Sequence, residues 1–181
     1  MADLLTAEQY ALLSKPEDGT RDELHRGNVV QWPLPGGRHG YCVGRTARIL
    51  DDHCELHSFP GHLCVGSGII VERGPDTVLA PAVSMWTKTK LAELSHRYPE
   101  IPPDLLVEVM DGYGETEEQV AFKIDAYLRF RVPLVWFVYP EDRSVHVYRS
   151  LPKRLILGEN DTLTGDPVLP GFSCLVRELF P

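Results

Sequence analysis

The chain has 181 residues, a length sufficient for one domain with its own hydrophobic core. Hydrophobic residues make up 43% and charged residues 24%, which are ordinary values for a globular protein. No apolar run is long enough to span a bilayer, and the N-terminal stretch lacks the apolar core of a secretory signal, so we expect a cytoplasmic protein. The net charge of −8 argues against a protein that coats nucleic acid by bulk electrostatic attraction.

The N-terminal third predicts a short helix, a hairpin and a long helix. Thr6 to Gln9 fits a capping box for a helix that ends near Ser14. Residues 22–26 and 29–32 are typical of two strands that turn at Gly27-Asn28. From His39 to about His57, four apolar residues recur at helical spacing and predict a long amphipathic helix: Val43, Ala47, Leu50 and Cys54.

The middle of the chain predicts strands. Residues 63–65 and 69–71 form two short apolar runs separated by Gly-Ser-Gly. Residues 78–86 predict one longer strand, and residues 88–98 a loop with a short helix.

The central stretch, residues 104–149, predicts strand, loop, helix, strand, turn and strand. Residues 105–110 form a short apolar run, typical of a strand that is covered on both faces. Glu108 interrupts this run, and an ionised carboxylate there is costly unless it is partnered, hydrated or bound to a cation. The following helix carries an apolar stripe of Val120, Ile124, Tyr127 and Leu128. Residues 132–138 and 144–148 predict the next two strands.

Lys123 lies at the border of that helical stripe, so its ammonium can reach over the sheet. We expect Glu108 and Lys123 to approach each other at one end of the sheet, in a cleft open to solvent. Two readings are open. The pair supports metal-dependent chemistry, with Glu108 holding a divalent cation and Lys123 positioning a water, or it is a strand glutamate paired with a helix lysine.

The C-terminal part predicts small edge strands at residues 154–157 and 162–163 and a final short helix at residues 174–179. The sequence contains no repeat, linker or low-complexity segment, so we expect one domain over residues 1–181. A zinc site is an alternative for one segment, where His53, His57, His62 and Cys64 offer four ligands. The absence of a Cys-x₂-Cys pair and the apolar position of Cys54 argue against it.

The sequence resembles a large bacterial family of restriction-endonuclease-like proteins within the PD-(D/E)XK nuclease-like superfamily. No single matching segment is specific, but their order and spacing together are. The matching segments are residues 23–27, 39–40, 76–81, 103–109, 123, 126–128, 135–138 and 169–172. The resemblance implies an α/β fold of the restriction-endonuclease-like type, with a central mixed sheet flanked by helices.

The resemblance also implies a set of site residues. The family follows the proline of the 76–81 segment with an aspartate that binds metal, and here Pro81 is followed by Ala82. Glu108 matches the second metal ligand, and Lys123 matches the catalytic lysine. Alanine offers no oxygen to a hard cation such as Mg²⁺. Asp111 is the candidate for a displaced ligand, because the loop after the strand can bend back.

Two further positions match the family and are expected as neighbours of the site. Glu23 could lean toward the metal from the hairpin, and His39 could lie near a substrate phosphate. The alternatives are a surface salt-bridge role for Glu23 and a structural role at the start of the helix for His39, and each is at least as well supported.

The implied function is metal-dependent hydrolysis of DNA phosphodiesters, weakened or inactive because of Ala82. The alternative is a non-catalytic module of the nuclease fold that binds nucleic acid or a protein partner. The expected cofactor is Mg²⁺ or Mn²⁺ if the protein is active and none otherwise. We expect DNA as the partner, with a homodimer left open, and neither a membrane nor a nucleotide cofactor.

Overall fold

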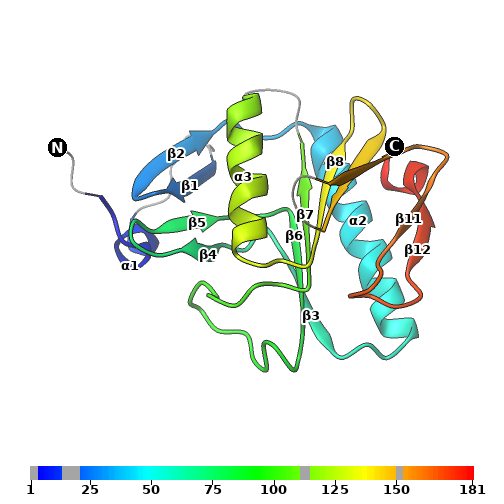
Figure 1. Cartoon of the computed structure of the whole chain (residues 1–181), viewed down its shortest axis with the longest axis horizontal. Coiled ribbons are helices and arrows are strands. Elements are labelled where there is room, and N and C mark those ends of the chain that lie inside the picture. Colours follow the sequence, from blue (N-terminus) through cyan, green and yellow to red (C-terminus); the bar gives the residue numbers. More distant parts are fainter. Residues whose placement is uncertain (1–3, 14–20, 111–114, 150–152) are drawn as a thin grey trace.

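The computed structural model describes residues 4–13, 21–110, 115–149 and 153–181. Its largest element is a six-stranded sheet (Figure 1). In spatial order the strands are β10 (Arg154–Gly158), β9 (Ser144–Tyr148), β8 (Leu134–Tyr139), β7 (Leu105–Val109), β6 (Val83–Thr87) and β3 (Gly61–Val65). β7 and β8 are parallel, and the other neighbouring strands are antiparallel. The expected α/β fold with a central mixed sheet is therefore confirmed.

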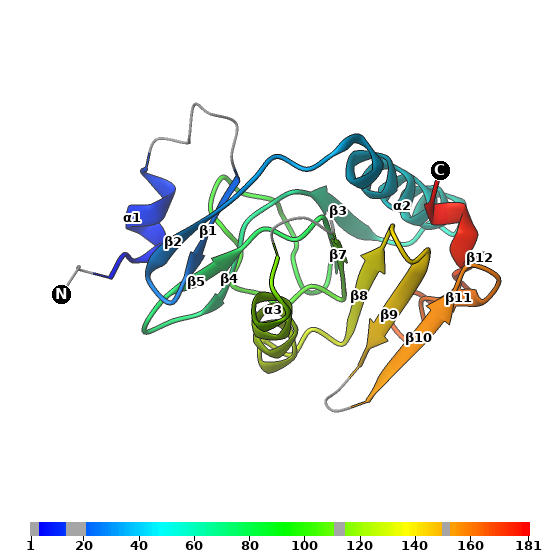
Figure 2. The ribbon, with the colours of Figure 1, turned by 90° about the horizontal axis from the view of Figure 1, so that it is seen from above.

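A second, antiparallel sheet lies beside the first, which the sequence did not indicate (Figure 2). Its strands are, in spatial order, β2 (Asn28–Trp32), β1 (Arg21–His25), β5 (Thr77–Leu79) and β4 (Ile69–Glu72). The short helix α1 (Ala7–Ala11) begins with the expected capping box and buries Ala7 and Tyr10 against this sheet.

Two helices cover opposite faces of the six-stranded sheet (Figure 2). α2 (Gly37–Leu56) carries the expected apolar stripe and packs on one face, together with the ribbon of β11 (Thr162–Thr164) and β12 (Ser173–Leu175). α3 (Glu117–Arg129) packs on the other face, next to β4 of the second sheet. Alternate residues of β7 therefore point to different cores, with Val107 toward α2 and Leu106 toward α3.

The expected single strand at residues 78–86 is wrong, because the structure divides it between the two sheets. β5 ends at Leu79 in the four-stranded sheet, and β6 begins at Val83 in the six-stranded sheet. Pro81 has no N–H to donate to a ladder, so it suits the point where the chain passes from one sheet to the other.

Three smaller predictions also need correction. Residues 88–98 contain turns and bends but no helix. The predicted C-terminal helix is β12 followed by one 3₁₀ turn, η1 (Val176–Leu179). The hairpin turns at Arg26-Gly27, one residue earlier than expected, since His25 pairs with Asn28 and both turn residues have positive φ.

Gly27 and Gly44 form a matched pair for testing the fold. A Cβ at Gly27 would lie 2.6 Å from the Leu4 Cβ at a φ of +78°, whereas a Cβ at Gly44 within α2 would meet nothing within 4 Å. We expect Gly27→Ala to lower the free energy of unfolding by about 1–2 kcal/mol. Gly44→Ala should raise it by about 0.5–1 kcal/mol. Urea unfolding of both variants measures this, and equal effects would contradict the turn geometry.

Candidate functional site

Glu108 is the acidic residue of β7, and the strand's alternation places it on the face that α3 covers. Its neighbours Val107 and Val109 point into the opposite core. Only 6% of Glu108 is exposed. The carboxylate is therefore buried between the sheet and α3, not in a cleft open to solvent as expected, and it needs partners inside the protein.

Lys123 supplies the first partner. The capping box of Thr116 and Gln119 fixes the start of α3, and Lys123 lies two turns into the helix with 5% of its surface exposed. Its Nζ is 3.4 Å from Glu108 Oε1, 3.3 Å from Glu23 Oε1 and 3.5 Å from Glu115 Oε1. One ammonium thus lies among three carboxylates, and we call these four residues with Tyr127 the lysine cluster.

Glu23 joins the cluster from β1 and is the most strongly held of the three carboxylates. Its Oε1 accepts the N–H of Ala80 at 3.0 Å, and its Oε2 accepts the indole N–H of Trp32 at 3.1 Å. His25 Nε2 lies 3.0 Å from the same Oε2. The Trp32 ring also lies 5.3 Å from Lys123 Nζ, a favourable cation–π contact.

Tyr127 completes the cluster on the next turn of α3. Its hydroxyl donates to Glu108 Oε1 at 2.5 Å, and its side chain is fully buried. Glu108 Oε1 therefore receives both the phenol and the ammonium, and a charge-assisted hydrogen bond of this kind is among the stronger ones.

The electrostatics of the cluster separate the two strand carboxylates. Burial opposes the ionisation of Glu23, but Lys123, His25 and the Ala80 N–H outweigh it and lower its pKa to about 2. Burial dominates at Glu108 and raises its pKa to about 7, against the opposing effects of Lys123 and Tyr127. Burial would lower the pKa of Lys123, but the three carboxylates more than compensate and raise it. The site thus pairs a Glu23 that is ionised at neutral pH and a charged lysine with a carboxyl, Glu108, whose pKa is raised to about 7.

Ala82 comes directly before β6, whose pairing with β7 ends at Val83 opposite Val107. Its side chain packs in the core on the α2 face of the sheet, whereas Glu108 contacts Lys123 and Tyr127 of α3 on the other face. Ala82 is 7% exposed and lines, together with His39 of α2, a cavity of about 610 Å³. The methyl group therefore contributes to the wall of this cavity and offers no oxygen to a cation.

The lysine cluster does not fit a divalent cation in this arrangement. Mg²⁺ takes oxygen ligands at about 2.0–2.1 Å in near-octahedral geometry. Here the carboxylates converge on an ammonium at 3.3–3.5 Å. Across residues 4–13, 21–110, 115–149 and 153–181, no three His, Cys, Asp or Glu side chains gather so that they could hold a metal.

Comparison with known proteins shows the family of the chain. The model of the Uma2 family, described as "Putative restriction endonuclease", matches residues 7–177. The chain belongs to the Uma2 family. A solved structure of a "putative nuclease belonging to DUF820" from Anabaena variabilis is similar in fold, with a TM-score of 0.79, 15% identity and 97% of each chain covered. No curated protein matches the chain.

The Uma2 chain brings together only part of the expected site. Glu108, Lys123 and Glu23 meet, whereas Ala82 packs in the core on the α2 face of the sheet. His39 is buried on α2 and lines the cavity next to Ala82. Asp111, the expected substitute ligand, lies outside the described residues.

The alternative zinc residues have other contacts. His53 stacks on His57 with ring centroids 4.1 Å apart. His62 Nε2 lies 3.2 Å from the Ala92 carbonyl oxygen, and Cys64 packs against the core on the α3 side of the sheet. In the described part of the chain these residues therefore form no metal-binding group.

Sequence reasoning missed three members of the site. Tyr127 is four residues after Lys123 and so lies on the same helix face, a spacing that could have identified it. Glu115 precedes the helix cap and Trp32 comes from the hairpin, so no local pattern marks either residue as a neighbour of Lys123.

Tyr127→Phe tests the hydrogen bond to Glu108. Because the phenol stabilises the ionised carboxylate, its loss should raise the pKa of Glu108 further above its ordinary value and destabilise the fold by about 1–3 kcal/mol. Carboxyl ¹³C NMR titration measures the pKa. The exposed Tyr41→Phe is the control and should leave the pKa of Glu108 unchanged; the same result for Tyr127→Phe would show that the bond has no influence.

Glu108→Gln tests the raised pKa through the pH dependence of stability. The folded protein binds the proton of the Glu108 carboxyl more tightly than the unfolded chain does. The contribution of this proton to the free energy of unfolding is therefore full below pH 4.5 and is lost as the pH rises to about 7. The depressed pKa of Glu23 acts in a separate window, and its stabilisation is lost as the pH falls from 4.5 toward 2.

In the wild type, the free energy of unfolding should decline by an amount on the order of 3 kcal/mol between pH 4.5 and 7, and Glu108→Gln should remove this decline. The decrease below pH 4.5, which comes from Glu23, should remain in the variant. Urea unfolding across the pH range measures it, with the exposed Glu93→Gln as control. A decline that persists in Glu108→Gln would assign it to another group.

Proposed function

We propose that this Uma2 chain is a DNA endonuclease of the phosphodiester-hydrolysing type whose activity is weakened or lost. The observation that carries the proposal is Ala82, which stands just before β6, the neighbour of β7, where the family resemblance calls for a metal-binding aspartate. Glu108 and Lys123 remain in place, so the chain keeps part of the machinery of a nuclease and lacks one oxygen ligand.

The contacts of Lys123 support this reading. In a working site a lysine stabilises charge that develops on the phosphate. Here its ammonium is shared among Glu23, Glu108 and Glu115, and these three carboxylates hold it within the protein. A lysine whose ammonium is already held by three internal carboxylates stabilises the charge on a substrate phosphate less than a lysine whose N–H groups are free to donate to it.

A non-catalytic module of the same fold is the second candidate, and Ala82 is also the observation that favours it. Such a module would bind nucleic acid or a protein partner without cutting. We place the protein in the cytoplasm in both cases. None of the described helices is long and apolar enough to cross a membrane.

Ala82→Asp should restore chemistry if a nuclease site has been lost. The new carboxylate would supply the hard oxygen that the family resemblance places at this position, as a divalent cation requires. We expect Mg²⁺- or Mn²⁺-dependent nicking of supercoiled plasmid by Ala82→Asp, at least about tenfold above wild type. Ala82→Asn is the matched control, since it has nearly the same shape without the charge.

A second control is Ala82→Asp combined with Lys123→Ala, which should nick no faster than wild type. Nicking by wild type at the rate of Ala82→Asp would mean that another ligand already replaces the aspartate. Folded variants that bind DNA with no nicking in any of them would favour the binding module.

A further inference from the structure

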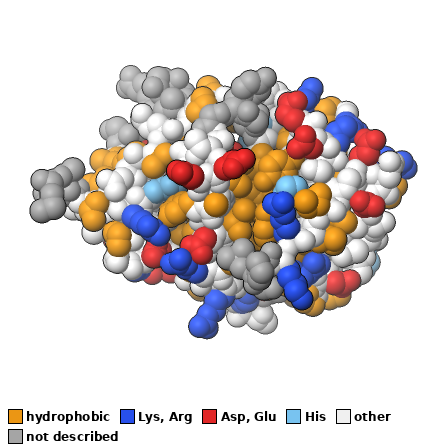
Figure 3. All heavy atoms as spheres, turned by 45° about the horizontal axis from the view of Figure 1, so that its top comes forward, with side chains coloured by type: hydrophobic (Ala, Val, Ile, Leu, Met, Phe, Trp, Pro, Cys, Tyr) orange, Lys and Arg blue, Asp and Glu red, His pale blue; other side chains and the backbone are white. Residues whose placement is uncertain are grey.

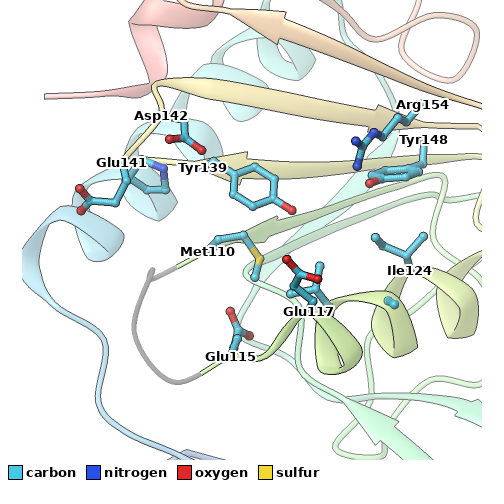
Figure 4. A pocket seen from close by; sticks show the side chains of 12 residues that line it. Met110, Glu115, Glu117, Ile124, Tyr139, Glu141, Asp142, Tyr148 and Arg154 are labelled. Atoms are coloured by element: carbon cyan, nitrogen blue, oxygen red, sulfur yellow. The ribbon is translucent and has the colours of Figure 1, made fainter.

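A pocket of about 570 Å³ lies between the sheet and the start of α3, at the carboxyl ends of the parallel strands β7 and β8 (Figure 4). This volume suits a small organic ligand. We call it the α3 pocket. It meets the lysine cluster only at Glu115, which lines the pocket and pairs with Lys123.

The walls of the α3 pocket are apolar and aromatic. Figure 4 shows Tyr139 and Tyr148 on the sheet side, with Met110 and Ile124 facing them. Both rings pack against neighbouring rings. The ring centroids of Tyr139 and His146 are 4.4 Å apart, and those of Tyr148 and Phe137, which meet edge-on, are 5.7 Å apart. The pocket thus offers fixed aromatic surfaces to a ligand.

The charge at the pocket is predominantly negative. Its lining contains four carboxylates and one cationic side chain: Glu115, Glu117, Glu141 and Asp142 against Arg154. Glu141 pairs with Arg38, but both side chains are more than half exposed, so this pair is weak. Glu115 shares Lys123 with two other carboxylates. Among the described residues, the lining itself therefore has more carboxylates than cationic side chains.

Figure 3 shows the end of the molecule where β7 finishes, with hydrophobic side chains gathered in the middle and acidic, basic and histidine side chains along their border. A phosphate or carboxylate ligand would meet repulsion here, whereas a cation would gain both the electrostatic attraction and contact with the aromatic rings.

We propose that the α3 pocket binds an organic cation, an ammonium or guanidinium group on a short apolar chain. The chain would lie on Met110 and Ile124, and the cationic group would lie near Glu117 and Asp142, which are exposed carboxylates at the rim. The same chemistry can come from a free amine or from a Lys or Arg side chain of a polypeptide. The proposal does not depend on nuclease activity.

Titration of the full chain with n-butylammonium and n-butylguanidinium tests the proposal, read by methyl ¹³C NMR. We expect saturable shifts of the Met110 and Ile124 methyl signals with both cations. n-Butanol, which has the same chain without the charge, should give no saturable shift at the same concentrations. Tetralysine separates the two sources: tighter binding than butylammonium assigns the pocket to polypeptide side chains, and weaker binding assigns it to free amines.

Glu117→Gln combined with Asp142→Asn should weaken the binding of both cations roughly fivefold or more. Glu55→Gln combined with Glu93→Gln is the matched control, because it makes the same change of net charge at exposed residues that do not line the pocket. Equal weakening by both double variants would show only bulk attraction and overturn the site, as would saturable binding of butanol or tighter binding of inorganic phosphate than of the amines.

Discussion

The buried ammonium of Lys123 is the interaction on which the site depends. It connects α3 with β1 of one sheet and β7 of the other, through Glu23 and Glu108. Removing charged groups from water is costly, so each member of the cluster is tolerable only while the others are present. Loss of one partner from such a group typically costs about 3–5 kcal/mol, because the remaining charges stay buried without compensation. The cluster therefore fixes how the second sheet and α3 meet around Glu108.

The same ammonium partly neutralises the carboxylates around it. Glu108 has Lys123 and Tyr127 as its partners, and Lys123 is also shared with Glu23 and Glu115. Position 82 lies at the passage between the sheets, just before β6, and its methyl group adds no oxygen there. Glu115 also lines the α3 pocket, so the lysine cluster and the pocket share one carboxylate.

The sequence was sufficient for the residues that stand out from a regular pattern. Glu108 interrupts an apolar strand and Lys123 borders an apolar stripe, and those two departures predicted the pair that the structure brings to 3.4 Å between Lys123 Nζ and Glu108 Oε1. It was insufficient for contacts made by distant elements. Trp32 and Glu115 reach Lys123 only because the hairpin and the start of α3 converge there. The change of sheet at Pro81 was also missed, since the flanking apolar runs look like one strand.

Calorimetric titration of the wild-type chain with Mn²⁺ tests most directly whether Lys123 stands in for the cation. The ammonium already neutralises Glu23 and Glu108, and position 82 offers no oxygen, so the account predicts no saturable binding at submillimolar Mn²⁺. Lys123→Gln should not create such binding unless Ala82→Asp is also present. Submillimolar affinity in the wild type that disappears in Glu108→Ala would contradict the account.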